Sequence, residues 1–137
     1  MKHNLDVAWK GQMKFETELN GHTLIVDADP ELGGEDAGPR PKKLILMALA
    51  GCTGMDVVSL LKKMHIDVDD FNMSIDADLT DEHPKHYQSM HVKYRFKGKD
   101  LPLEKLQKIV DMSQERYCGV AATLKLGLPI TWEVVLE

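Results

Sequence analysis

Two cysteines carry the most reactive side chains of this sequence. Cys52 stands in the most apolar run of the chain, LILMALAGCTGMDVV at residues 44–58, and Asp56 follows it by four residues. Cys118 stands far downstream, in the segment ERYCGVAATL. Two isolated thiols can do redox chemistry or can simply fill a core. The run at 44–58 is therefore a membrane span, a core helix with an incidental cysteine, or a shelter for a reactive thiol.

The local setting of Cys118 favours ionisation of its thiol. A short helix is predicted to begin at this residue, and unpaired N–H groups at a helix start lower the pKa of a thiol. The neighbouring Arg116 acts in the same direction. Judged from their neighbours in the sequence alone, the Cys118 thiol ionises more easily and the Cys52 thiol is more sheltered from water. If the fold brings them together, one thiolate can attack a peroxide and the other can close a disulfide on the resulting sulfenic acid.

Other polar residues offer weaker candidates. Asp56 is predicted to face the same side of a helix as Cys52, where it either hydrogen-bonds a buried group or orients a site. His83 and His86 raise the possibility of a metal, but the cysteines stand alone, whereas structural zinc sites pair their ligands at short spacing. We therefore expect no metal and no other cofactor. A serine hydrolase is not favoured, because no nucleophile-elbow pattern is present.

Composition and charge narrow the classes of function. The chain has 137 residues, of which 43% are hydrophobic and 28% charged, as expected for one folded domain over residues 1–137. With 17 basic and 22 acidic residues, its net charge of −5 disfavours nucleic acid or an anionic membrane as a partner. No signal peptide is recognised at the start, so we expect a cytoplasmic protein with reduced thiols.

Hydrophobic periodicity predicts the order βββ-α-ββ-αα-β, an α+β class of fold. Asn20-Gly21 predicts a tight hairpin between two of the first three strands. A long helix is predicted from Pro41 to about Met64, and alternating strands at 71–79 and 89–97. Two helices, the second in GVAATLKL, and a last strand in ITWEVVL complete the order.

The long helix is apolar on nearly every face. Its 18 residues from 44 to 61 reach the lower limit for a membrane span, but Asp56 near the centre would cost about 2.5–3.5 kcal/mol. A helix of this kind must otherwise be buried on nearly every side, which is difficult within one small domain. The pattern therefore predicts a homodimer in which two such helices pack together beneath sheets.

The segments GPRPKKLILMALAGCTGMDVVSLLKKM and SQERYCGVAATL resemble the OsmC/Ohr family of osmotically inducible and organic hydroperoxide resistance proteins. The resemblance covers nearly the whole chain. It implies an intertwined homodimer with long central helices backed by antiparallel-rich sheets. It also implies a cysteine-based peroxidase in which Cys52 attacks a small organic hydroperoxide, Cys118 resolves, and a dithiol reductant resets the pair. In this assignment Cys52 is the attacking thiol, although the neighbours of the two cysteines in the sequence indicate that Cys118 ionises more easily.

The sequence also departs from the pattern of the family's peroxidases. They carry a glutamate just after the proline that opens the central helix, where this chain has Lys42, and an early arginine, where it offers Lys10 and Gln12. Arg40 or Lys42 is then the candidate cation for the thiolate, and the alternative for Arg40 is a solvated loop residue. The rival hypothesis is a non-catalytic dimer of the same fold that binds a small apolar or sulfur-containing ligand. A third is a structural dimer with inert core cysteines.

Overall fold

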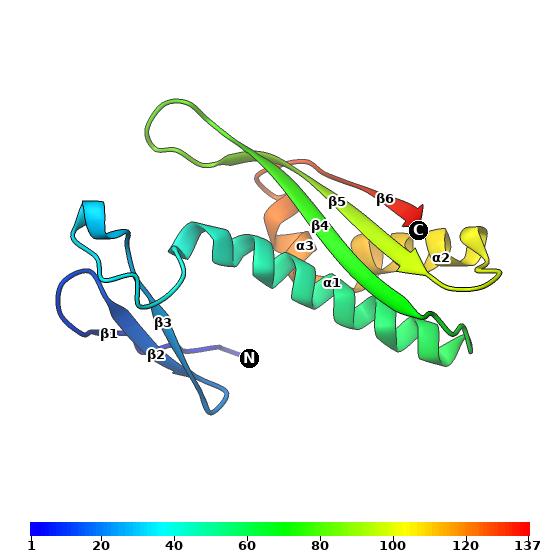
Figure 1. The fold of residues 1–137 in the computed structure, drawn as a ribbon, viewed down its shortest axis with the longest axis horizontal. Helices are drawn as coiled ribbons and strands as arrows, with labels where there is room; N and C mark the ends of the chain where they lie inside the picture. Colours follow the sequence, from blue (N-terminus) through cyan, green and yellow to red (C-terminus); the bar gives the residue numbers. More distant parts are fainter. The chain divides into compact units, whose positions relative to one another are not determined.

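The computed structural model describes all residues from 1 to 137, and the chain forms two compact units, Met1–Met47 and Ala48–Glu137. Figure 1 labels the strands and α-helices in chain order. The order of the regular elements is βββ-α-ββ-αα-β, as the periodicity predicted.

The first unit holds a three-stranded antiparallel sheet made of β1 (Ala8–Trp9), β2 (Phe15–Leu19) and β3 (His22–Val26). Asn20 and Gly21 join β2 to β3 with φ angles of 52° and 81°. Two positive φ angles in succession are what a type I′ hairpin turn requires, and asparagine and glycine tolerate them best. The predicted hairpin is therefore confirmed.

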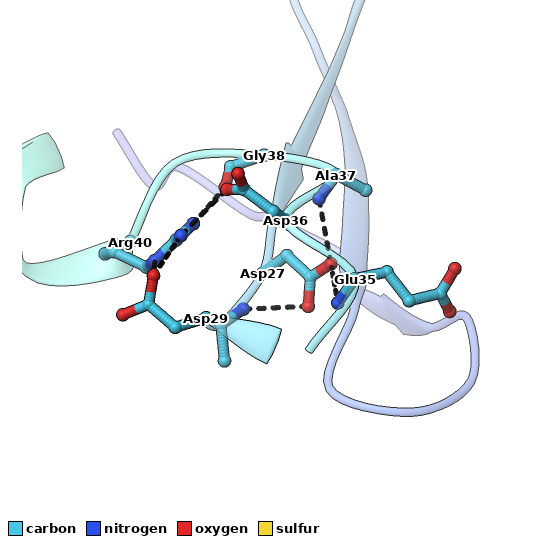
Figure 2. A network of polar contacts seen from close by, with 8 residues as sticks. Asp27, Asp29, Glu35, Asp36, Ala37, Gly38 and Arg40 are labelled. Atoms are coloured by element: carbon cyan, nitrogen blue, oxygen red, sulfur yellow. Dashed lines mark hydrogen bonds and ion pairs between the residues drawn. The ribbon is translucent and has the colours of Figure 1, made fainter. Parts of the chain in front are cut away.

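A loop containing the short 3₁₀ turn η1 (Pro30–Leu32) follows β3 and is organised by two acidic residues (Figure 2). The buried Asp27 carboxylate accepts hydrogen bonds from the backbone N–H groups of Ala28, Glu35 and Ala37. Asp29 binds the guanidinium of Arg40 further along the loop. The loop thus has fixed internal partners despite its content of glycine and proline.

The second unit is built on a sheet in which β5 (Tyr87–Lys97) lies between β4 (Asp70–Leu79) and β6 (Ile130–Leu136). β4 pairs with β5 antiparallel, whereas β6 pairs with β5 parallel. The predicted inward residues of β5 are buried, namely Met90, Val92, Tyr94 and Phe96. The ring of Phe71 on β4 stacks on that of Phe96 at a centroid distance of 4.6 Å. The strict alternation in the sequence therefore identified the core face of this sheet.

Helix α1 (Leu44–Lys63) follows the turn η2 (Pro41–Lys43), with Pro41 at the helical entry as predicted. Its buried side chains recur every four residues, at Leu49, Thr53, Val57 and Leu61. The helical segment 41–63 contains an 18-residue window with a mean hydropathy of 2.0 and is long enough to cross a membrane. The same length and composition also suit a core helix, and the four buried side chains place one face of α1 in the interior of the protein.

Three short helical segments connect β5 to β6. They are α2 (Leu103–Met112), the π-helical turn η3 (Ser113–Tyr117) and α3 (Gly119–Lys125). The sequence predicted the two α-helices but gave no sign of the π-helical turn. Such turns occur mostly as single insertions into α-helical segments, often at functional sites. Here the turn lies immediately before Cys118.

Candidate functional site: two thiols and a buried hydroxyl chain

The two cysteines come from different elements of the second unit. Cys52 lies on α1 and is partly exposed, whereas Cys118 follows η3 and is 3% exposed. Both are free thiols. Cys52 is one of the neighbouring groups that raise the pKa of the Cys118 thiol, so the two side chains lie near each other. The fold therefore brings together two side chains that are widely separated in the sequence.

The backbone around Cys118 fixes the position of its sulfur. Cys118 is the N-cap residue of α3, and its Sγ accepts a hydrogen bond of 3.3 Å from the N–H of Ala121. Its own N–H donates to the carbonyl of Ser113 at 2.8 Å, closing the π-helical turn. The prediction that a helix begins at Cys118 is confirmed, and the thiol has the expected N–H donor.

The acidity of Cys118 is nevertheless set by burial. Loss of solvent raises the pKa of this thiol to about 11, against an ordinary value of 9.0, and the neighbouring Cys52 and Asp56 act in the same direction. The N–H of Ala121 lowers the pKa but does not compensate. The expectation from the sequence counted the helix start and omitted desolvation, which is the larger effect on the pKa of this thiol.

A chain of buried polar side chains lies next to the thiols. The hydroxyl of Ser113 donates to Asp56 at 2.8 Å, and Ser113 and Thr53 have their oxygens 2.6 Å apart. Thr53 is also 2.6 Å from the hydroxyl of Tyr94, to which the amide of Gln114 donates at 2.7 Å. The predicted alternative for Asp56, a hydrogen bond to a buried side chain, is the one observed.

The chemistry of the end groups gives this chain one direction. A carboxylate can only accept, so the single hydrogen of Ser113 goes to Asp56. Ser113 then accepts from Thr53, and Thr53 in turn accepts from Tyr94. Burial raises the pKa of Tyr94, so its hydroxyl keeps the proton that this arrangement requires. The amide oxygen of Gln114 is left buried without a partner.

Two pockets lie on either side of Tyr117. One of about 260 Å³ is lined by η3 and the start of α3, including Cys118, Arg116 and Lys125. The other, of about 470 Å³, includes Asp56 and Lys63. Lys125 donates to the carbonyl of Gln114 and lies over the ring of Trp132. The pocket beside Cys118 is therefore lined by two positively charged side chains, those of Arg116 and Lys125.

Arg40 belongs to the first unit, and its guanidinium is already engaged there. It binds Asp29, donates to Asp36 at 2.7 Å and donates to the carbonyl of Gly38 at 2.8 Å (Figure 2). These contacts lower the pKa of Asp29 and raise that of Arg40. These contacts hold the loop before α1, and the predicted role of Arg40 beside the Cys52 thiolate stays a prediction.

Four members of the hydroxyl chain were missed as site residues, namely Thr53, Tyr94, Ser113 and Gln114. Ser113 did carry a signal, because it continues the buried helical stripe that includes Leu106, Ile109 and Val110. A serine at a core position of a stripe needs a polar partner. Thr53, a polar residue next to Cys52 in an apolar helix, carried the same signal. No sequence pattern, however, could pair the two.

The structure contains no cluster of three or more histidine, cysteine or acidic side chains arranged to hold a metal ion. His83 and His86 lie in the loop between β4 and β5 and are exposed.

Comparison with known proteins agrees with this fold. The family model for OsmC-like protein matches residues 33–133. Protein YhfA of Escherichia coli K12 is 33% identical over 132 residues, covering 94% of this chain and 96% of YhfA.

Two solved structures extend the comparison. A hypothetical protein from Aquifex aeolicus is 28% identical, with a TM-score of 0.81 over 100% of this chain and 99% of its own. An organic hydroperoxide resistance protein from Elizabethkingia anophelis shares the fold at 11% identity, with a TM-score of 0.72 over 100% and 99%. The match of the family model and the similarity to YhfA lead to one conclusion: this chain belongs to the OsmC-like family.

Proposed function

We propose that this protein reduces small organic hydroperoxides with Cys52 and Cys118 as a two-cysteine redox pair, in defence against oxidative stress. The observation that carries the proposal is the proximity of two free thiols from α1 and the start of α3. A fold shared with a protein named for organic hydroperoxide resistance supports the choice of substrate. Two reduced cysteines also suit a cytoplasmic location.

The burial of Cys118 supports the division of roles between the thiols. Attack on a peroxide requires a thiolate, and a thiol with a pKa of about 11 is almost fully protonated at neutral pH. Cys52, which is partly exposed, is therefore the attacking residue. Its thiolate takes one oxygen from the hydroperoxide and becomes a sulfenic acid, and the alkoxide leaves as an alcohol after protonation.

Resolution follows between the two cysteines. The sulfur of Cys118 attacks that of the Cys52 sulfenic acid, a disulfide forms, and the hydroxyl leaves as water with the proton of Cys118. A dithiol reductant then donates two electrons by thiol–disulfide exchange and restores both thiols. No metal or organic cofactor takes part in these proposed reaction steps.

Two further residues are proposed to support the site. Asp56 holds Ser113, and through it the segment that carries Cys118. Arg40 is proposed to supply positive charge for the Cys52 thiolate, and its two carboxylate partners would share that charge. The apolar character of α1 favours an organic peroxide over hydrogen peroxide, because such a substrate partitions into apolar surroundings.

The working form is proposed to be a homodimer. Within one chain α1 leaves large apolar side chains exposed, Met47 by 65% and Met55 by 76%. An exposed apolar patch of this kind marks an interaction surface. A second copy of the same helix is the partner expected for the family.

A non-catalytic dimer that binds a small apolar or sulfur-containing ligand is the alternative function. It is favoured by Lys42, which stands at the entry of α1 in η2, where the resemblance leads one to expect a glutamate. In that case the thiols would not turn over, and peroxide would not consume a dithiol reductant.

The decisive experiment is thiol titration with mass spectrometry before and after one equivalent of cumene hydroperoxide. We expect rapid loss of both thiols and an intramolecular Cys52–Cys118 disulfide. Cys52→Ser should abolish peroxide consumption. Cys118→Ser should retain one oxidation event, visible as a sulfenic acid on Cys52 that dimedone traps.

Hydrogen peroxide at the same concentration serves as the comparison for substrate preference. Equal rates with both peroxides would refute the preference for organic substrates but leave the redox pair intact. Thiols that survive cumene hydroperoxide unchanged would refute the peroxidase and favour the ligand-binding dimer.

A further inference from the structure

Ser113 links the helix of one thiol to the turn before the other. Its side chain is bonded to α1, 2.6 Å from the hydroxyl oxygen of Thr53, the residue next to Cys52. Its main-chain carbonyl oxygen accepts a hydrogen bond from the N–H of Cys118, with 2.8 Å between nitrogen and oxygen. Two hydrogen bonds through one residue thus connect the neighbour of Cys52 to the backbone of Cys118.

The π-helical turn makes this double attachment possible. The bond from Cys118 to Ser113 spans five residues, whereas an α-helical bond would span four. The wider turn ends the helical path at Cys118, whose φ of −75° and ψ of 103° are extended. Ser113 therefore stays at the buried stripe of the helix while Cys118 leaves the helix to cap α3.

The hydroxyl chain is buried along its length. Thr53, Tyr94 and Ser113 are 0% exposed, and Gln114 is 2% exposed. A buried polar group that loses its partner cannot turn to water instead, so a network of this kind strongly prefers one arrangement. The carboxylate of Asp56 fixes the direction of every bond in it. The arrangement of α1 against η3 is therefore specified by hydrogen bonds as well as by apolar packing.

We propose that Ser113 and Thr53 are positioning residues for the resolving step, holding the sulfur of Cys118 in line with that of Cys52. This inference rests on the proposed two-cysteine function. Disulfide formation is sensitive to such positioning, because the bond needs the two Cβ atoms about 3.5–4.5 Å apart with a restricted torsion angle. Attack on the peroxide involves Cys52 alone and does not depend on the position of Cys118.

The test compares variants that keep or remove the hydroxyl at the same place. Thr53→Val removes the hydroxyl at nearly constant volume, whereas Thr53→Ser keeps it and loses only a methyl group. Ser113→Ala removes the central hydroxyl. Ser89→Ala is the matched control, because Ser89 also donates to an aspartate, Asp78, but on β5 and β4, outside the hydroxyl chain.

The first measurement is the effective concentration of the Cys52–Cys118 pair, obtained from its equilibrium with dithiothreitol. We expect Thr53→Val and Ser113→Ala to lower it about tenfold or more, as poorly aligned thiols lose the advantage of proximity. In Thr53→Ser and Ser89→Ala the effective concentration should stay within about twofold of that in the unmodified protein. A general loss of packing would lower the effective concentration in Thr53→Ser as well as in Thr53→Val. The conservative variant Thr53→Ser therefore separates a positioning role from an effect on stability.

The second measurement separates the two chemical steps with cumene hydroperoxide. In Thr53→Val and Ser113→Ala the Cys52 thiol should be oxidised at a rate within about twofold of normal. The sulfenic acid on Cys52 should then persist, because Cys118 converts it to the disulfide only slowly. Dimedone should therefore label Cys52 in these variants. Disulfide formation at the normal rate in both variants would overturn the positioning role.

The failure of this inference differs from the failure of the proposed function. An unmodified protein that never forms the disulfide with peroxide refutes the function, and the dithiothreitol equilibrium still decides whether Ser113 and Thr53 position the thiols. A normal disulfide in the unmodified protein together with unchanged effective concentrations in the variants refutes the positioning role alone.

Discussion

At the scale of single residues, Cys118 shows how two effects of opposite sign compete at one atom. The start of α3 offers its sulfur a backbone N–H, which stabilises a thiolate. Burial removes the solvent that a thiolate needs, and this loss is the larger effect on the pKa. The same thiol that looks activated in the sequence is therefore kept protonated in the fold, a state suited to a resolving residue.

The raised pKa of Cys118 predicts a loss of stability at alkaline pH. The folded-state pKa of about 11 lies above the ordinary value of 9.0, so the stability due to the protonated thiol is fully present below pH 9. It is lost as the pH rises through the folded-state value. The difference corresponds to at most about 3 kcal/mol in the free energy of unfolding.

Urea unfolding near pH 8 and near pH 11, in the presence of a reductant, measures this loss. Cys118→Ala removes the titrating group, so its loss of stability between the two pH values should be smaller. Cys52→Ala serves as the comparison for the neighbouring thiol. An equal loss in Cys118→Ala and in the unmodified protein would show that Cys118 is not the group responsible.

At the scale of elements, the loop between β3 and η2 depends on charged side chains for its shape. The Asp27 carboxylate accepts hydrogen bonds from three backbone N–H groups, and the Arg40 guanidinium binds both Asp29 and Asp36. The ion pairs are at the surface, where each contributes little, but the carboxylate of Asp27 is buried and satisfies N–H groups that have no strand or helix to bond. Asp27 is therefore the more important anchor of the loop.

Asp27→Asn tests this anchor through its pH dependence. Backbone hydrogen bonds, above all that from Ala37, lower the pKa of Asp27. The stability due to the ionised carboxylate is thus present above the unfolded-state pKa near 3.8 and is lost as the pH falls through the lower folded-state value. We expect Asp27→Asn to be less stable at neutral pH and less sensitive to acid.

The measurement is the urea midpoint at neutral pH and near pH 3. Glu31→Gln is the control, because Glu31 is an exposed carboxylate in the same loop, on η1. An Asp27→Asn protein as stable as normal at neutral pH would contradict the anchoring role of this carboxylate.

At the scale of the whole molecule, the apolar faces of α1 are the basis of the proposed homodimer. Leu49 and Val57 fill the interior of the chain, while Met47 and Met55 on the same helix remain exposed. Burying an apolar side chain yields about 25 cal/mol for each Å² removed from water. A second copy that covers these residues is the proposed source of that burial.

In the proposed dimer, Met55→Lys places a charge in the apolar contact between the two copies of α1, so it is expected to shift the protein from dimer to monomer. Size-exclusion chromatography with light scattering measures the mass directly. Leu126→Lys provides a matched control, since Leu126 is 91% exposed at the end of α3. A Met55→Lys protein that remains dimeric would show that this face of α1 lies outside the interface.

The sequence by itself determined the element order, the Asn20-Gly21 hairpin, the core face of β5 and the two candidate thiols. Each of these depends on periodicity or on turn chemistry within a few residues. The tertiary structure alone decided the parallel pairing of β6 with β5, the engagement of Arg40 and the protonation of Cys118. It also joined Thr53 to Tyr94 and Ser113, which lie 41 and 60 residues away. Burial and long-range hydrogen bonds arise only when distant segments meet, and no local pattern records which groups will then exclude water together.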